Sequence, residues 1–201
     1  DFATIIDGMP VNMRTHGHGQ GYTDLNFLIP ETVSQLTYQK GAYYADIGDF
    51  SGAGSAQIVT SNTLRHGVME ATYGENDYYR LLLMNSTPMV GGETLFALEA
   101  SRYDGPWSDI EEDLDKLNVL LKHTIPLSRG NLNLSLMVYD NSWNSADQIP
   151  RRAVEQGIID ELGSLDETVG GESSRYSLSA NWQIGGWQGS AYLIDYDLNL
   201  W

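Results

Sequence analysis

The sequence contains no cysteine, and only 11 lysine and arginine residues stand against 27 aspartate and glutamate residues, giving a formal net charge of −16. Without cysteine the chain can form neither a disulfide nor a Cys-ligated zinc site. The scarcity of cations argues against a nucleic-acid partner, because a protein that binds the phosphate backbone presents a basic face.

Long hydrophobic runs are also missing. No apolar stretch is long enough for a membrane helix, and the first ten residues lack the basic stretch, apolar core and cleavage site of a signal peptide. A helical membrane protein is therefore excluded. Strands of a membrane β-barrel need only about ten residues with alternate positions apolar, so the modest hydropathy of this chain is compatible with a barrel.

Enzyme motifs are absent as well. The sequence has no Gly-x-Ser-x-Gly, no His-Glu-x-x-His, no phosphate-binding loop and no array of zinc ligands. A pair of acids suited to glycoside hydrolysis is uninformative in a chain that has 27 of them. We therefore expect a protein that is not an enzyme and uses no cofactor.

The composition and the hydrophobic pattern of the chain change near residue 63. Residues 1–63 are rich in glycine and turn signals, and their short apolar stretches predict short strands. One helix is expected over residues 30–35, with Pro30 in its first turn and Glu31 beside the positive end of the helix dipole. This part is predicted to be a small mixed α/β domain.

Residues 64–201 show long segments in which apolar and polar residues alternate. The clearest segment places Leu132, Leu134 and Leu136 on one face and Asn133 and Ser135 on the other. Seven candidate strands share this pattern, at residues 64–74, 79–83, 96–100, 117–125, 131–138, 176–184 and 192–200. We therefore predict an antiparallel β-structure for this part.

The connections between these strands alternate in length. Tight turns are expected at residues 88–92, 126–130 and 185–186, and long connections at residues 104–115 and 141–172. Outer-membrane barrels have short turns on one side and long loops on the other, and their strands are longer than those of a soluble β-sandwich. The pattern favours a barrel, and a soluble β-sandwich that binds or hydrolyses carbohydrate is the alternative.

Four pieces of the first sixty residues carry a more specific signal. Residues 5–12 (IIDGMPVN), 16–25 (HGHGQGYTDL), 28–41 (LIPETVSQLTYQKG) and 44–55 (YADIGDFSGAGS) occur in this order. They resemble segments of the plug domain of TonB-dependent outer-membrane receptors, including the Asp-Gly-x-Pro strand and turn. Ala42 departs from that pattern, in which proline usually follows Lys-Gly.

The resemblance implies a fold that is mainly β: a partial antiparallel transmembrane β-barrel at residues 64–201, preceded by the end of a plug domain at residues 1–63. It implies energised uptake of a scarce ligand, a ferric siderophore or another chelate, across the outer membrane. The expected partners are this ligand, outer-membrane lipid and the TonB complex, which would bind a segment outside this sequence. A porin is a further alternative, although a porin would not need the first 63 residues.

The same resemblance implies that the loop after the Asp-Gly-x-Pro strand faces the ligand. The residues expected to contact it are Arg14, His16, His18, Gln20 and Tyr22. Imidazole is a good ligand for transition metals, but two histidines do not complete a site, so no metal site is predicted. A second group of five acids, at residues 109–115, is expected to form a solvated loop, with calcium binding as the alternative.

Overall fold

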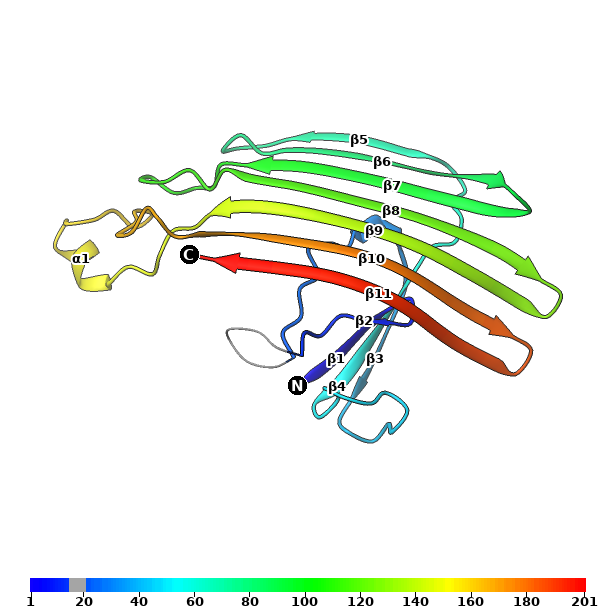
Figure 1. Ribbon diagram of the computed structural model, residues 1–201. Coiled ribbons are helices and arrows are strands. Elements are labelled where there is room, and N and C mark those ends of the chain that lie inside the picture. Colours follow the sequence, from blue (N-terminus) through cyan, green and yellow to red (C-terminus); the bar gives the residue numbers. More distant parts are fainter. Residues whose placement is uncertain (15–20) are drawn as a thin grey trace.

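The computed structural model describes residues 1–14 and 21–201, which form two β-sheets (Figure 1). The elements of the first sheet and its connections are β1 (Phe2–Ile6), β2 (Met9–Pro10), the 3-10 helix Pro30–Thr32, β3 (Val33–Lys40) and β4 (Gly54–Thr60). Those of the second are β5 (Val68–Tyr73), β6 (Tyr79–Met89), β7 (Gly92–Tyr103), β8 (Leu114–Leu127), β9 (Gly130–Asn144), α1 (Arg151–Glu155), β10 (Gly170–Ile184) and β11 (Trp187–Leu200).

The first sheet has four strands in the order β2-β1-β4-β3. Strands β1 and β4 are parallel, whereas β1 with β2 and β3 with β4 are antiparallel. The turn between β1 and β2 is made by Asp7 and Gly8, both of which have positive φ, 48° and 79°. Asparagine, aspartate and glycine tolerate this conformation best, which explains why an Asp-Gly pair occupies the turn.

The second sheet is an antiparallel meander in which each strand pairs with the next, from β5 to β11. This confirms the seven strands predicted from the alternating pattern. Within the described residues the sheet does not close on itself, so β5 and β11 are its edges. No helix in this part of the chain is long and apolar enough to cross a membrane.

The long connections lie together at one end of the second sheet. Backbone hydrogen bonds join the connections at this end: Asp104 donates to Asn76 in the short connection between β5 and β6, and Ser108 donates to Leu162. We call this the long-connection end, and the end with turns at residues 90–91, 128–129 and 185–186 the tight-turn end. The asymmetry expected from the sequence is therefore present in the structure (Figure 1).

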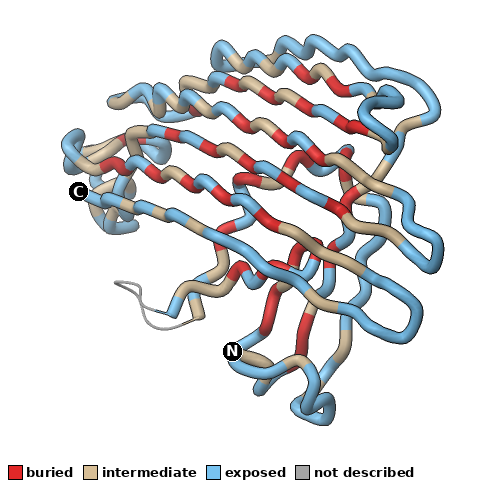
Figure 2. The backbone as a smooth tube through the Cα atoms, turned by 45° about the vertical axis from the view of Figure 1, so that its right-hand side comes forward, coloured by how far each residue is buried: buried red, intermediate tan, exposed pale blue. Residues whose placement is uncertain are grey.

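The second sheet arches over the first, so that it has an inner face toward the four-stranded sheet and an outer face away from it (Figure 1). Buried and exposed residues alternate along its strands (Figure 2). In β10, Ser177 and Ser179 on the inner face are 4% and 6% exposed, whereas Leu178 on the outer face is 54% exposed. Along this part of β10 the polar side chains are thus covered and the apolar side chain is exposed.

The hydrophobic core lies between the two sheets. Ile6, Met9 and Ile58 from the small sheet pack with Leu82 and Leu95 from the large one. The other members of this cluster are Val11, Phe27, Ile29, Met84, Ala97, Leu120, Met137 and Tyr139. Each fully buried aliphatic side chain contributes on the order of 1.5–3 kcal/mol, so this cluster holds the two sheets together.

The helix predicted over residues 30–35 is wrong beyond its first turn. The 3-10 helix Pro30–Thr32 is closed by the Thr32 hydroxyl, which donates to the carbonyl of Ile29 at 2.7 Å. Val33 then begins β3 and pairs with Thr60. A β-branched residue next to an available strand favours pairing over continuation of a helix. Within the described residues, the first 63 positions contain no α-helix.

A second helix is expected from the four-residue spacing of Val154, Ile158 and Leu162. The structure has a helix only at Arg151–Glu155, and Gly157 with φ of 67° follows it. Glycine in this conformation ends a helix, so Ile158 and Leu162 lie in irregular chain.

In strand β10 the apolar side chains lie on the outer face, whereas in β11 most of the large apolar side chains lie on the inner face. Tyr192, Ile194 and Tyr196 pair with Ser179, Ser177 and Arg175 of β10, and residues directly opposite in an antiparallel pair share a face. The larger apolar side chains of β11 therefore line the inner face, while Asp195 and Asp197 lie on the outer face. The alternation was predicted, but its direction required the register with β10.

Candidate functional site

The segment that follows β2 is fixed by the side chain of Asn12. Its Oδ1 accepts a hydrogen bond from the amide of Thr4 at 2.7 Å, and its Nδ2 donates to the carbonyls of Phe2 and Gly21 at 2.9 and 3.1 Å. Met13 and Tyr22 form an isolated β-bridge that closes the segment between them. The Asn12 side chain therefore ties this segment to β1 and explains the asparagine after the Asp-Gly-x-Pro turn.

Two of the five predicted contact residues lie in the described part of the chain. Arg14 is exposed, and Tyr22 is 39% exposed. Burial raises the pKa of the Tyr22 hydroxyl, and the nearby carboxylate of Asp24 raises it further. The other three predicted residues, His16, His18 and Gln20, lie outside the described residues.

Tyr22 lines a cavity of about 330 Å³ at the long-connection end of the second sheet. Asp24 and Asn26 line it from the same segment, and Trp143 lines it from β9. The remaining lining residues are Glu112, Leu114, Tyr139, Asn141, Leu198 and Leu200. Burial raises the pKa of Glu112. This cavity combines aromatic walls with oxygen acceptors and contains no lysine or arginine among its lining residues.

Arg14 lines a different cavity, so the structure does not bring Arg14 and Tyr22 into one pocket. This cavity has a volume of about 570 Å³ and lies between residues 10–14 and strands β10 and β11. Arg175 and four residues of β11, Tyr192, Ile194, Asp195 and Tyr196, contribute to its lining.

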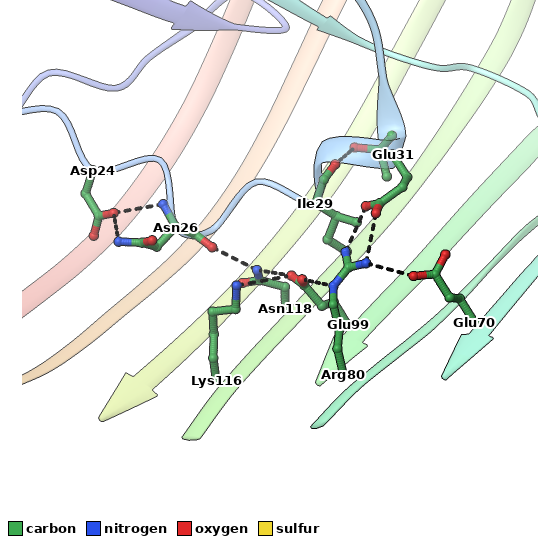
Figure 3. Close-up of polar contacts among 10 residues, drawn as sticks. Asp24, Asn26, Ile29, Glu31, Glu70, Arg80, Glu99, Lys116 and Asn118 are labelled. Atoms are coloured by element: carbon green, nitrogen blue, oxygen red, sulfur yellow. Dashed lines mark hydrogen bonds and ion pairs between the residues drawn. The ribbon is translucent and has the colours of Figure 1, made fainter. Parts of the chain in front are cut away.

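Ion pairs join the two sheets near the 3-10 helix (Figure 3). Both carboxylate oxygens of Glu31 accept hydrogen bonds from Arg80 at 2.9 Å, and Arg80 Nε donates to Glu99 at 2.7 Å. Glu70 lies 3.7 Å from Arg80 as a third partner. The hydrogen bonds from Arg80 hold the pKa of Glu31 below its ordinary value. A bidentate pair of this kind fixes orientation as well as charge.

The same cluster continues along the inner face (Figure 3). Lys116 lies 3.5 Å from Glu99, and Asn118 donates to Glu99 at 2.9 Å and to the backbone carbonyl of Asn26 at 2.8 Å. Glu99 is 3% exposed, and its three partners, Arg80, Lys116 and Asn118, compensate its buried charge.

A second cluster is buried more completely. Lys122 of β8 donates to the carboxylate of Asp7 at 3.2 Å and to the hydroxyl and carbonyl of Thr60 at 2.9 and 3.0 Å. The Thr60 hydroxyl donates to Asp7 in turn. The side chains of Lys122 and Asp7 are 1% and 3% exposed. All three ammonium donors are thus used, in the manner that makes a buried ion pair tolerable.

The Asp7 and Gly8 turn is also held from β10 and β11. Asn181 donates to the carbonyl of Asp7, and Ser190 donates to the carbonyl of Gly8, both at 2.9 Å. A side-chain carbon on Gly8 would come within 3.0 Å of the Ser190 side chain. Glycine is therefore required here by its conformation and by the close approach of the large sheet.

The interface residues Arg80, Glu99 and Lys122 are absent from the sequence-based set. One signal could have found them, because each is a charged residue on the polar face of a strand predicted to line a barrel. Pairing them with Glu31 or Asp7 needs the tertiary structure. The described residues contain no group of three or more histidine, aspartate and glutamate side chains arranged to hold a metal ion.

The fold has clear counterparts among solved structures. The siderophore receptor PiuA from Acinetobacter baumannii aligns with 98% of this chain at a TM-score of 0.73 and 14% identity. The chain has the fold of the aligned part of this receptor. The ferric-catecholate import receptor Fiu from E. coli K12, in its open form, aligns with 97% of the chain at a TM-score of 0.65 and 13% identity. The ferric citrate transporter FecA, in its unliganded form, aligns with 98% of the chain at a TM-score of 0.67 and 15% identity.

These alignments cover 29% to 32% of the matched proteins, so the chain spans about a third of their length. No protein-family model and no curated protein matches the sequence. The resemblance to TonB-dependent receptors is confirmed at the level of fold, as is the prediction of a mainly β chain with an antiparallel barrel-type sheet.

Proposed function

We propose that this chain is part of a TonB-dependent outer-membrane receptor that imports a scarce ligand, a ferric siderophore or a similar chelate. Residues 1–63 would be the end of its plug domain and residues 64–201 the first seven strands of its barrel. The observation that carries this proposal is a small sheet bound to the inner face of a barrel-type sheet whose outer face is apolar and exposed.

The outer face supports a membrane location. Its central positions include Leu121, Leu136 and Leu178, which are 43%, 39% and 54% exposed. Leu81, Phe96, Leu117, Leu134 and Leu193 are further exposed residues of this face. An apolar surface that extends over six neighbouring strands, β6 to β11, is unfavourable in water and favourable in lipid. In a soluble β-sandwich a second layer would cover this face, so the alternative is disfavoured.

The inner face supports a plugged rather than an open barrel. Lys122 of the large sheet forms an ion pair with Asp7, in the turn between β1 and β2. Asn118 of β8 donates hydrogen bonds to Glu99 and to the backbone carbonyl of Asn26, in the segment before the 3-10 helix. A simple porin would not need the small sheet of residues 1–63 inside its barrel. For ligand to pass, the small sheet must move or reshape, so these polar contacts must break and re-form with water.

The ligand would bind at the long-connection end. We propose that Arg14, His16, His18, Gln20 and Tyr22 contact it, with Asp24, Asn26 and Trp143 completing the wall beside Tyr22. We also propose that the protein binds and translocates the ligand without chemical change, in agreement with the receptors and transporter that share its fold.

The test begins with the location of the gene product. Cells expressing the gene would be fractionated, and the product would be examined by electrophoresis in detergent with and without heating, since a closed barrel migrates faster before heating. We expect an outer-membrane, heat-modifiable protein. A soluble product would overturn the proposal and favour the β-sandwich.

Uptake is tested in a second step. Cells with and without the gene would be given radioactive iron as ferric siderophores of several classes, in the presence and absence of a functional TonB system. We expect gene-dependent and TonB-dependent accumulation for one class. Accumulation that persists without TonB would contradict energised transport and favour a passive pore.

A further inference from the structure

The cavity of about 570 Å³ beside Arg14 differs in charge from the cavity beside Tyr22. Two arginines, Arg14 and Arg175, line it against one acid, Asp195. Asp195 belongs to the set of β11 side chains on the outer face of the sheet, whereas Arg175 lies on the inner face. The inner part of this cavity is therefore positive.

Arg175 is buried and incompletely paired. Its side chain is 1% exposed, its Nε has no hydrogen-bond partner, and its Nη2 donates only a long bond of 3.4 Å to the carbonyl of Pro10. It forms no ion pair with any residue that the structure describes. The guanidinium lies over the ring of Phe27 at 4.5 Å, and Asp24 attracts it electrostatically from beyond ion-pair distance.

A buried guanidinium in this state is unfavourable. An aromatic face and one long hydrogen bond do not replace the water lost from five N–H donors. Elsewhere on the same face, Lys122 and Arg80 each have a carboxylate partner at 3.2 Å or less. Arg175 is thus the exception among these three inner-face cations, and it lines the cavity beside Arg14.

We propose that this cavity is an anion site that takes a carboxylate or phosphate group. Arg175 would bind the group from β10, and Arg14 would bind it from the segment after β2. The planar guanidinium fork matches the two oxygens of either group, which an ammonium group does not. Because Arg14 lies in the segment after β2 and Arg175 lies in β10, a bound anion bridges this segment and the large sheet.

The inference does not depend on import. The bound group is a phosphate or a carboxylate, and the two differ in the probe that binds. The gene product, purified in detergent, would be titrated with sodium phosphate and separately with sodium citrate by calorimetry at constant ionic strength, with sodium chloride as reference. We expect one saturable site. Preference for phosphate indicates that the site takes a phosphate group, and preference for citrate indicates that it takes a carboxylate.

Three variants locate the site. Arg175→Gln should abolish the saturable heat, and Arg14→Gln should weaken binding roughly tenfold through loss of one charged hydrogen bond. Arg129→Gln, an exposed arginine in the tight turn between β8 and β9, is the matched control and should bind as the unmodified protein does. Heat-modifiable migration checks that each variant is folded.

Because Arg14 is exposed, its replacement leaves the core intact. Arg14→Gln therefore tests the anion site even if Arg175→Gln does not fold. Absence of saturable binding beyond the chloride reference overturns the proposal, as does binding that Arg14→Gln leaves unchanged. A heat-modifiable outer-membrane protein without anion binding would refute this site alone. A soluble product would refute the receptor function alone.

Discussion

The two faces of the seven-stranded sheet differ in which side chains they expose and which they bury. On β8, Leu121 of the outer face is 43% exposed, while its neighbour Lys122 of the inner face is 1% exposed. A water-soluble protein normally does the reverse, because exposed leucine and buried lysine are both unfavourable in water. The outer face is therefore suited to an apolar solvent, and the inner face is suited to a protein surface that supplies counter-charges.

The largest expected effect comes from breaking the inner face at Lys122. Lys122→Met leaves the Asp7 carboxylate buried without its cation, and removal of one partner of a buried pair costs about 3–5 kcal/mol. Denaturant unfolding of the gene product in detergent would measure the loss. The double variant Lys122→Met with Asp7→Asn removes both charges and should recover part of it. A loss below about 1 kcal/mol for the single variant would refute the interpretation.

The outer face is tested by Leu178→Arg, at the middle of β10. A cationic side chain facing the bilayer midplane costs about 2–4 kcal/mol, falling to about 0–1 kcal/mol near the interface. Asp197→Arg, at the long-connection end of the same face, is therefore the matched control. Folding into lipid vesicles should be impaired by the first change and little altered by the second. Equal behaviour of the two variants would mean that this face does not meet lipid.

The contact between the sheets at the β1–β2 turn is tested by Gly8→Ala. A residue other than glycine in this conformation costs about 1–2 kcal/mol, and the contact with Ser190 adds to that cost. Gly185→Ala has a similar φ of 61° in a tight turn without a close neighbour, so it reports the conformational cost alone. We expect the larger loss of unfolding free energy for Gly8→Ala. Equal losses would show that the approach of Ser190 is unimportant.

The smallest effect is expected at the half-exposed pair of Glu31 and Arg80. Its contribution of about 0.2–1 kcal/mol should disappear in Glu31→Gln and fall in high salt. Because the pKa of Glu31 in the folded state is lowered, this stability is present above the ordinary value of 4.5 and is lost as pH falls through the folded value. Stability measured between pH 6 and about 3 should fall less for Glu31→Gln than for the unmodified protein. Glu70→Gln, a more distant partner of Arg80, is the control.

Much of this architecture could be predicted because it depends on local patterns. Alternation at Leu132, Leu134 and Leu136 predicts a strand whichever element lies beside it. The turn at the Asp-Gly pair of residues 7–8 was expected from the resemblance to plug segments, and it forms there because few residues adopt positive φ. The helix predicted after Pro30 failed because spacing and capping signals do not reveal that Val33 can pair with Thr60.

The candidate site could be predicted only in part. The plug-like motifs led to Arg14 and Tyr22, which the structure places in two different cavities. Arg175 gave no signal in the sequence, since a charged residue on the polar face of a strand is ordinary. Its interest arises from burial without a counter-ion, and that depends on Phe27 and Pro10, which are more than 140 positions away in the chain.

The sequence by itself determined the seven strands, their turns and the separation of polar from apolar faces, because side-chain alternation and backbone conformation are properties of neighbouring residues. Only the tertiary structure decided which face of β11 turns inward, which carboxylate meets each buried cation, and which cation has none. Those features depend on strand register and on the seating of one sheet against the other, where residues far apart in sequence share one low-dielectric interior.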